Sequence, residues 1–458
     1  MLFHWTTGSL GTADGRCLPY LRLVRFLLPL AVTMVIAGLM PQFLSGGIAR
    51  GPRPTETLAA FALAWGIADL LASPMSQVRQ LGLVLVSNRY QARQVLGFVV
   101  ACGFVLASVL GGLALTPAGH FVVDDLHNAS PELSRVVRYA LMLLIPYPLL
   151  QAVERYAEGL LMRVRRTEIV SVAMLCNIGV SLLVVLVVVG TGLVQDTPIL
   201  LPLLVTYTGI GTNLLVLGAG VRRYVHPRLQ DGSISGGDEA NLDFLYLGRF
   251  FWPLALTMAF QGMSRPLINL FISRGFHGEQ ALAALAVVYS LAHLPYGWMN
   301  ELRSLPSVFQ EYGKAGLRRI RRFAVACGAL SFALMVIAFW LPPVRDMVLL
   351  ELLALPPELA QRCHTPLMLF SFFPLTVAPR GYLQGIALRE RRTAALAPSA
   401  PARIGAILAI LLFVPLSWMH GATLGVAALL NGFIIEAVVM WWFVHGRRPV
   451  LPEVAGQA

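Results

Sequence analysis

Long apolar stretches alternate with short polar segments along the whole chain. Stretches such as 169–190 and 323–341 approach the roughly 20 residues that a helix needs to cross a bilayer. The pattern predicts twelve helical spans. In the first half they lie near 23–43, 57–78, 94–115, 136–160, 169–190 and 199–220, and in the second near 249–272, 281–303, 322–341, 364–388, 395–416 and 421–444. The sequence therefore predicts an all-α polytopic membrane protein.

One half of the chain repeats the other. Residues 25–81 align without a gap on residues 249–305, and 20 of the 57 paired residues are identical. Six spans in each half, an even number, make both copies run the same way through the membrane, so a pseudo-two-fold axis along the membrane normal relates them. We expect an N-terminal six-helix bundle over 1–220, a polar cytoplasmic linker over 221–243 and a C-terminal six-helix bundle over 244–458.

Composition supports a membrane protein. The chain is 57% hydrophobic and 13% charged, with a mean hydropathy of +0.71, whereas about 25% of a soluble domain is charged. The net charge of +12 comes from Lys and Arg that gather in the loops of one side. By the positive-inside rule this side, which carries both termini, is cytoplasmic. The basic charge then faces the lipid bilayer and argues against a nucleic acid partner.

Polar residues inside the apolar spans are the candidate functional groups, because ionisable side chains at bilayer depth normally face a cavity or a partner. Gln261, Arg265 and Asn269 recur every four residues on one helical face. Pro266 is expected to kink the helix beside the Arg265 guanidinium. The alternative reading is a structural arginine that pairs with a neighbour or reaches the far interface.

A second polar stripe lies in the next span, beside Pro295. Its members are His293, Tyr296, Asn300 and Glu301. A water-filled cavity explains such a stripe better than isolated hydrogen-bonded packing of a histidine. Arg303 and its copy Arg79 lie close to the predicted cytoplasmic end, which favours an interfacial role for both.

Two further arginines lie in later spans. Arg380 is deep and follows a proline, whereas Arg403 is only about two turns into its span, which predicts that it snorkels to the surface. The first-half counterpart of Arg380 is Glu154, and that of His293 is Asp69. We hypothesise that Glu154 faces Arg380, and Asp69 faces His293, across a shared pathway.

Several phrases of the sequence resemble the progressive ankylosis protein family, and the likeness covers nearly the whole chain. The phrases that carry it include Ser264-Arg265-Pro266, Asn269-Leu270-Phe271, His293-Leu294-Pro295-Tyr296-Gly297-Trp298, Phe370-Ser371-Phe372-Phe373-Pro374 and, in the first half, Pro74-Met75-Ser76. The resemblance implies membership of the multidrug/oligosaccharidyl-lipid/polysaccharide exporter superfamily. Its members have twelve helices in two bundles around a V-shaped cavity.

The resemblance also implies export of small anions such as citrate, ATP and pyrophosphate. Asp69 and Glu154 depart from the animal members. The short tail after Arg447 and the loops suggest a bacterial relative in the inner (plasma) membrane. The residues that look similar to the family pattern are Arg265, Asn269, His293, Glu301, Arg303, Arg380 and Glu436.

We therefore expect a secondary active transporter that exports small organic or phosphorylated anions by alternating access. Arg265 and Arg380 would bind carboxylate or phosphate, which suit planar guanidinium groups. The residues expected to orient the substrate are Gln261, Asn269, His293, Tyr296 and Asn300. Coupling to a proton or another ion, or gating, would fall to Asp69, Glu154, Glu301, Arg303 and Glu436.

Two other functions stay open. The same fold would serve a flippase for a lipid-linked precursor or an antiporter of cationic drugs and protons, although a cation site should show unpaired carboxylates. A non-transporting scaffold or an enzyme is the other alternative. The sequence has no Ser/His/Asp constellation, phosphate-cradling glycine loop or metal-ligand cluster, so we expect neither an enzyme nor a bound cofactor or metal.

Overall fold

The computed structural model describes residues 18–446 apart from 38–43, 45–47, 49–52, 123–130, 190, 231–241, 274–277, 354 and 415–419. These described residues are almost entirely helical and contain no strand. The prediction of an all-α protein is confirmed.

The first half builds one bundle, here called the first bundle. Its longest members are α5 and α9, which are apolar along most of their length because lipid and neighbouring helices surround them. The elements are α1 (Tyr20–Ala37), α3 (Pro54–Ala72), the 3-10 turn η1 (Ser73–Gln77), α4 (Val78–Val84), α5 (Arg89–Leu115), α6 (Pro117–His120), α7 (Pro131–Leu143), α8 (Tyr147–Arg163), α9 (Thr167–Val188), α10 (Gly192–Asp196), α11 (Leu200–Gly220), the π-turn η3 (Val221–Val225) and α12 (His226–Gln230).

The second half builds the second bundle. Its first helix, α13, runs unbroken through Pro253 and Pro266. The elements are α13 (Phe244–Ser273), α14 (Gly278–His293), η4 (Gly297–Ser304), α15 (Leu305–Val308), η5 (Gln310–Tyr312), α16 (Gly313–Trp340), α17 (Pro342–Asp346), η6 (Met347–Leu352), α18 (Pro357–Phe370), α19 (Phe373–Arg389), η7 (Thr393–Leu396), α20 (Ser399–Phe413) and α21 (Gly421–Gly446).

The helices match the predicted membrane spans closely. Within the described residues seven helices are long and apolar enough to cross a membrane, and two bent helix pairs raise this to nine if each pair is one span. The remaining predicted spans coincide with α1, α13 and the pair α18 and α19. The protein is an integral membrane protein of two six-helix bundles.

Three predicted spans are interrupted, and a fourth is continuous but contains a 3-10 turn. The fourth span bends by 44° between α7 and α8, and the eighth by 47° between α14 and η4. Pro146 and Pro295 stand at these breaks, where proline removes a backbone donor and disfavours helix at the preceding residue. The second span contains η1. The tenth span is interrupted between the end of α18 and the start of α19. The breaks fall at equivalent places in the two copies.

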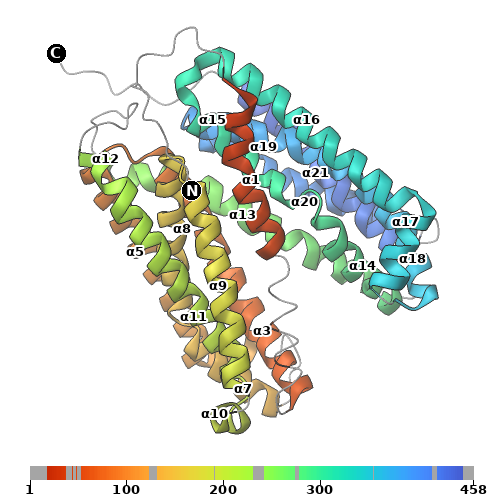
Figure 1. Cartoon of the computed structure of the whole chain (residues 1–458). Coiled ribbons are helices and arrows are strands. Elements are labelled where there is room, and N and C mark those ends of the chain that lie inside the picture. Colours follow the sequence, from red (N-terminus) through yellow and green to blue (C-terminus); the bar gives the residue numbers. More distant parts are fainter. Residues whose placement is uncertain are drawn as a thin grey trace, which may run out of the picture.

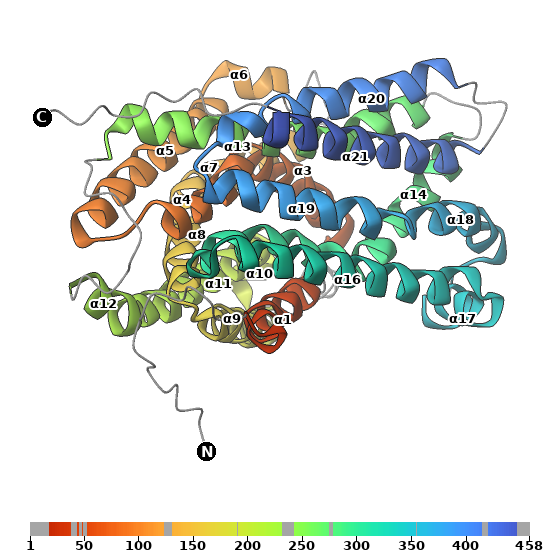
Figure 2. The same ribbon diagram turned by 90° about the horizontal axis from the view of Figure 1, so that it is seen from above.

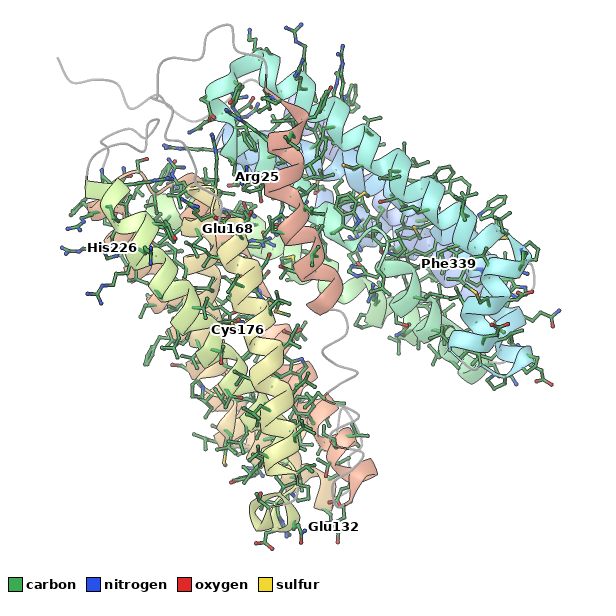
Figure 3. The ribbon with its side chains drawn as sticks, viewed as in Figure 1. Arg25, Glu132, Glu168, Cys176, His226 and Phe339 are labelled. Carbon is green, nitrogen blue, oxygen red and sulfur yellow. The ribbon has the colours of Figure 1, made fainter. Side chains whose placement is uncertain are left out.

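The two bundles form a V in Figure 1. They meet at the end where α12 and α15 lie, here called the apex, and diverge toward α10 and α17 at the open end. Figure 3 places Arg25 and His226 toward the apex and Glu132 at the open end. Seen from above, α19 lies between α16 and α21 in the second bundle (Figure 2).

The hydrophobic core explains why the bundles stay joined. The largest cluster of buried apolar side chains draws on both halves, from Leu23 and Phe26 to Met440. A separate cluster, which includes Ala60 and Leu203, belongs to the first bundle alone. Helix α13 packs within the second bundle and also contacts η1 of the first, whereas α1 packs on α9 and contacts η4 of the second bundle.

The predicted linker lies partly outside the described residues. Its first ten residues are helical, since η3 and α12 continue α11 to Gln230. The description resumes at Leu242, where the backbone amide donates to the Gln94 side chain over 3.1 Å.

Candidate functional site

A buried ionic cluster in the second bundle unites side chains from five elements. Glu436 on α21 is fully buried and accepts hydrogen bonds at Oε2 from Arg380 Nη1 and Arg403 Nη1, each over 3.1 Å. Its Oε1 accepts from Gln261 Nε2 on α13 over 2.9 Å. Asn300 Oδ1, from η4, accepts from Arg380 Nη2 over 2.7 Å. We call these five residues the Glu436 cluster.

The charges of this cluster do not balance. Two guanidinium groups share one carboxylate, and both lie over the Phe433 ring, Arg380 at 4.7 Å and Arg403 at 4.1 Å from its centroid. The Nε atoms of both arginines are buried without a hydrogen-bond partner among the described residues. The cluster therefore retains one net positive charge and two free donors.

Arg265 adds a third guanidinium nearby. It lies on α13, is exposed, and sits 4.8 Å from the centroid of the Tyr289 ring. Tyr296 interacts electrostatically with Arg265, Arg380 and Arg403, so all three guanidinium groups lie in its neighbourhood. Its ring packs edge-on against His293, with 5.3 Å between centroids. The structure thus brings together the predicted polar residues of three spans.

Asn269 stands one helical turn beyond Arg265. Its Oδ1 is buried and has no hydrogen-bond partner among the described residues. An unsatisfied buried acceptor normally takes water, an ion or a ligand group.

The first bundle carries carboxylates held by neutral partners. Glu154 on α8 is buried and accepts from Asn213 Nδ2 over 3.0 Å. Asp69 on α3 accepts from the Tyr147 hydroxyl over 3.3 Å, and that hydroxyl accepts from Gln151 Nε2 over 3.0 Å. The two halves therefore differ in charge at equivalent positions.

Neither hypothesised pair across the pathway is formed in this structure. Arg380 pairs with Glu436 of its own bundle instead of Glu154, and Asp69 bonds to Tyr147 instead of His293. Repeat symmetry makes Arg380 equivalent to Glu154, and His293 equivalent to Asp69. Arg380 and Asp69 nevertheless bond to partners within their own bundles.

The prediction that Arg403 snorkels to the surface is wrong. Its side chain is only 5% exposed and turns toward Glu436 on α21. The span that contains Glu436 is apolar and carries no cation between residues 421 and 444. A charge so isolated needs a counter-charge from another span, and this signal could have pointed to the arginines of neighbouring spans.

The interfacial role predicted for Arg79 and Arg303 is also wrong. Arg79 is buried, and its Nη2 donates to Glu301 Oε1 over 2.8 Å. Arg303 is half-buried, and its Nη1 donates to Gln77 Oε1 over 3.2 Å. Both contacts join the first bundle to the second, which places Glu301 and Arg303 between the bundles near the apex.

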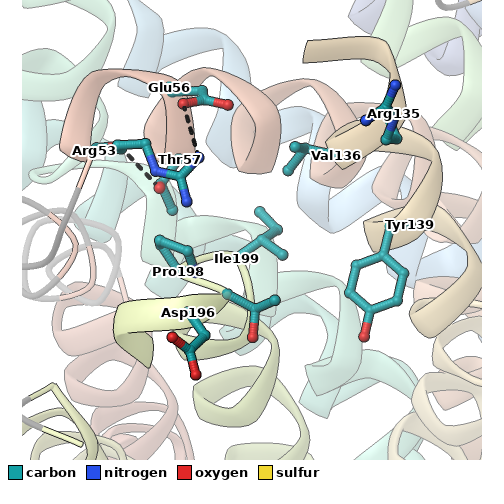
Figure 4. Close-up of a pocket in the computed structure, with 10 residues that line it drawn as sticks. Arg53, Glu56, Thr57, Arg135, Val136, Tyr139, Asp196, Pro198 and Ile199 are labelled. Carbon is teal, nitrogen blue, oxygen red and sulfur yellow. Dashed lines mark hydrogen bonds and ion pairs between the residues drawn. The ribbon is translucent and has the colours of Figure 1, made fainter. Parts of the chain in front are cut away.

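A separate pocket lies at the open end of the first bundle (Figure 4). Its volume is about 390 Å³, and Arg53, Glu56, Arg135 and Tyr139 line it together with Asp196 and its neighbours. None of the predicted site residues lines this pocket. The Arg53–Glu56 ion pair at its rim is long, 3.9 Å, and exposed.

Solved structures similar to this chain are transporters of one fold. The eukaryotic MATE transporter AtDTX14 superimposes with a TM-score of 0.68 at 15% identity, with 93% of this chain and 96% of that chain covered. A mutant of the Vibrio cholerae MATE transporter VcmN gives 0.67 at 13% identity, with the same coverage.

A third similar structure is a MOP superfamily transporter from Pyrococcus furiosus, for which a reverse polarity of the binding pocket has been described. Its TM-score is 0.63 at 16% identity, with 93% of this chain and 95% of that chain covered. At these identities the likeness establishes the fold.

Sequence similarity then identifies the family. The model of the progressive ankylosis protein (ANKH) family matches residues 15–341, which is more than half of the chain. The matched range contains Arg265, Asn269, His293 and Glu301, which were expected from the resemblance. The chain belongs to the progressive ankylosis protein family.

Proposed function

We propose that the protein is a secondary active transporter that exports small organic or phosphorylated anions by alternating access. The observation that carries this proposal is the surplus of guanidinium groups in the second bundle. Arg265, Arg380 and Arg403 all interact electrostatically with Tyr296, and among the described residues Glu436, which bonds to Arg380 and Arg403, is the one acidic group paired with any of the three.

A cationic surplus inside a membrane protein favours an anionic ligand. Burial of an unbalanced charge is costly, so an incoming carboxylate or phosphate group that pairs with the guanidinium groups lowers the free energy of the loaded state. Arginine presents its donors in a plane and binds such oxygens in pairs. The exposed Arg265 would make first contact, with Asn269 one turn away as a further polar group.

The first bundle would supply the coupling. Glu154 and Asp69 hydrogen-bond to an amide and a phenol. A proton or another cation that binds these carboxylates would not break a hydrogen bond to an arginine. Export driven by a coupled ion would then depend on the first bundle, and anion binding on the second.

Basic residues at the apex support a cytoplasmic position for this end. Helix α16 begins there with Lys314, Arg318, Arg319, Arg321 and Arg322 in its first three turns. By the positive-inside rule, both termini and the apex would face the cytoplasm, and the open end the other side.

An antiporter of cationic drugs and protons is the second candidate. Asp69 is exposed, and among the described residues Glu154 accepts its hydrogen bond from the Asn213 amide, which suits a cation in the first bundle. A flippase of a lipid-linked precursor would also use a cationic second bundle, but for a lipid-borne phosphate.

Ligand-dependent thermal stability separates these candidates. A ligand at one hundred times its dissociation constant stabilises the folded state by about 2.7 kcal/mol. We expect citrate, pyrophosphate or ATP to raise the apparent melting temperature of the purified protein, and Arg265→Ala or Arg380→Ala to abolish the rise. Arg318→Ala, which removes an exposed cation at the apex, should leave it unchanged.

The anion proposal fails if none of the three anions stabilises the wild-type protein. Stabilisation by tetraphenylphosphonium that disappears in Asp69→Asn would favour the antiporter. Efflux of labelled citrate from proteoliposomes would then confirm or reject transport of the stabilising anion.

A further inference from the structure

Two arginines cross between the bundles near the apex in a pseudo-symmetric pattern. Gln77 and Arg79 of the first bundle correspond to Glu301 and Arg303 of the second, 224 residues later. Arg79 donates to Glu301 over 2.8 Å, and Arg303 donates to Gln77 over 3.2 Å. Gln77 lies two residues before Arg79, and Glu301 lies two residues before Arg303. Each arginine therefore bonds across the bundles to the residue at the equivalent position of the other copy.

The backbone of each arginine is fixed to its own bundle by a glycine. A Cβ on Gly159 of α8 would lie 2.2 Å from the Arg79 carbonyl oxygen, and one on Gly385 of α19 would lie 2.7 Å from that of Arg303. These glycines also correspond in the repeat. Because each segment packs tightly on its own bundle, the bonds between the bundles must change when the apex separates.

The two bonds differ in charge. Arg79 to Glu301 is an ion pair whose side chains are 10% and 3% exposed, whereas Arg303 bonds to a neutral amide. Of these two bonds the Arg79 bond is the stronger, because charged hydrogen bonds are stronger than neutral ones.

Arg79 also has an acceptor in its own bundle. Glu158 Oε2 lies 3.9 Å from Arg79 Nη1, and the Glu158 side chain is 8% exposed. Arg155, one turn earlier on α8, donates to both oxygens of Glu158 over 2.9 and 3.0 Å. Arg79 thus lies within reach of two carboxylates, Glu158 of the first bundle and Glu301 of the second.

Separation of the bundles would not leave a buried charge unpaired. In the first bundle Arg79 and Arg155 would remain with Glu154 and Glu158, and in the second Arg303 would remain with Glu301, with which it interacts electrostatically. Each set has equal numbers of basic and acidic groups. Unpaired buried charges are strongly destabilising, so this balance permits movement.

We infer that Arg79 and Arg303 form a partner-exchange latch between the bundles. With the apex closed, Arg79 bonds to Glu301 and Arg303 to Gln77. With the apex open, Arg79 bonds to Glu158 and Arg303 to Glu301. Gln77 keeps the second bond neutral, and this limits how firmly the closed apex is held.

Pulsed electron–electron double resonance tests the latch without any ligand. Spin labels at His226→Cys and Lys314→Cys, both exposed near the apex, report the distance between the bundles once the five native cysteines are replaced by serine. We expect Glu301→Gln to raise the ratio of long to short distances roughly tenfold, because a neutral bond replaces a charged one. Gln77→Glu should lower the ratio by a similar factor.

Two further variants test the exchange itself. The charge reversal Arg79→Glu with Glu301→Arg should restore short distances that either single change loses. Glu158→Gln, combined with Glu301→Gln, should remove the gain in long distances, because Arg79 then lacks a charged acceptor in the open state. Arg318→Ala is the matched control and should leave the distribution unchanged.

The latch is rejected if Glu301→Gln and Gln77→Glu leave the distance distribution unchanged, or if both shift it in the same direction. A fall in melting temperature without a change in distances assigns these residues to packing alone. The readout needs no substrate, so failure of the anion proposal would not affect it.

Discussion

At the scale of single residues, the position of Glu436 decides how the second bundle tolerates its arginines. This carboxylate is fully buried and bonds to Arg380, Arg403 and Gln261. Removal of either arginine leaves a balanced ion pair, whereas removal of the carboxylate leaves two buried cations. The consequences of these substitutions should therefore be unequal.

We predict that Glu436→Gln destabilises the protein by about 3–5 kcal/mol, the usual effect of breaking a buried pair. Arg403→Gln should cost clearly less, because Arg380 still neutralises Glu436. Apparent melting temperatures in detergent measure the order. Glu390→Gln, at an exposed carboxylate, is the control, and equal losses for Glu436→Gln and Arg403→Gln would contradict the charge argument.

The sequence identified most of these residues but not their partners. Periodicity placed Gln261, Arg265 and Asn269 on one face, and the structure keeps them on α13. The pairing of Glu154 with Arg380 was inferred from repeat symmetry and is not formed. Symmetry relates backbone positions, whereas a side chain bonds to the nearest acceptor that its helix rotation allows.

At the scale of helices, close packing at glycines joins the broken spans to their neighbours. Gly159 brings α8 against the Arg79 segment, and Gly385 brings α19 against the Arg303 segment. The distances to backbone carbonyl oxygens leave no room for a side chain. The hydropathy pattern predicted these spans as continuous helices. It reports how apolar a stretch is, and the local turns at Pro74 and Pro295 do not change that.

We predict that Gly159→Ala destabilises the protein by about 1–3 kcal/mol, the typical cost of overpacking. The added methyl group meets a backbone oxygen that cannot rotate away. The matched control is Gly97→Ala in α5, where no atom lies within 4 Å of the added Cβ. That change should be neutral or stabilising by up to about 1 kcal/mol, since alanine favours helix.

Melting temperatures compare the two variants. A loss for Gly97→Ala as large as that for Gly159→Ala would mean that close contact at Gly159 is not the cause.

At the scale of the whole molecule, the bundles share a hydrophobic core near the apex and diverge toward the open end. Rigid-body rocking about such a joint requires the two ends to move in opposite directions. In the proposed alternating-access cycle, the V in Figure 1 would be the end state with the apex closed.

We predict that a stabilising anion changes the distances at the two ends in opposite senses. Labels at Glu132→Cys on α7 and Met347→Cys on η6 report the open end, and both residues are exposed. Their mean separation should fall as that of the apex pair at His226 and Lys314 rises. Movement of one pair alone would indicate a local gate instead of rocking.

The sequence by itself determined the membrane class, the positions of the spans, the duplication and the family. These features depend on local apolar length and on residue identity along the chain, which the sequence records directly. Only the tertiary structure decided which charges meet: Arg403 with Glu436, Arg79 with Glu301, and Glu154 with Asn213. Such pairings depend on the rotation and crossing of helices far apart in the chain, because contact energies between side chains act through space.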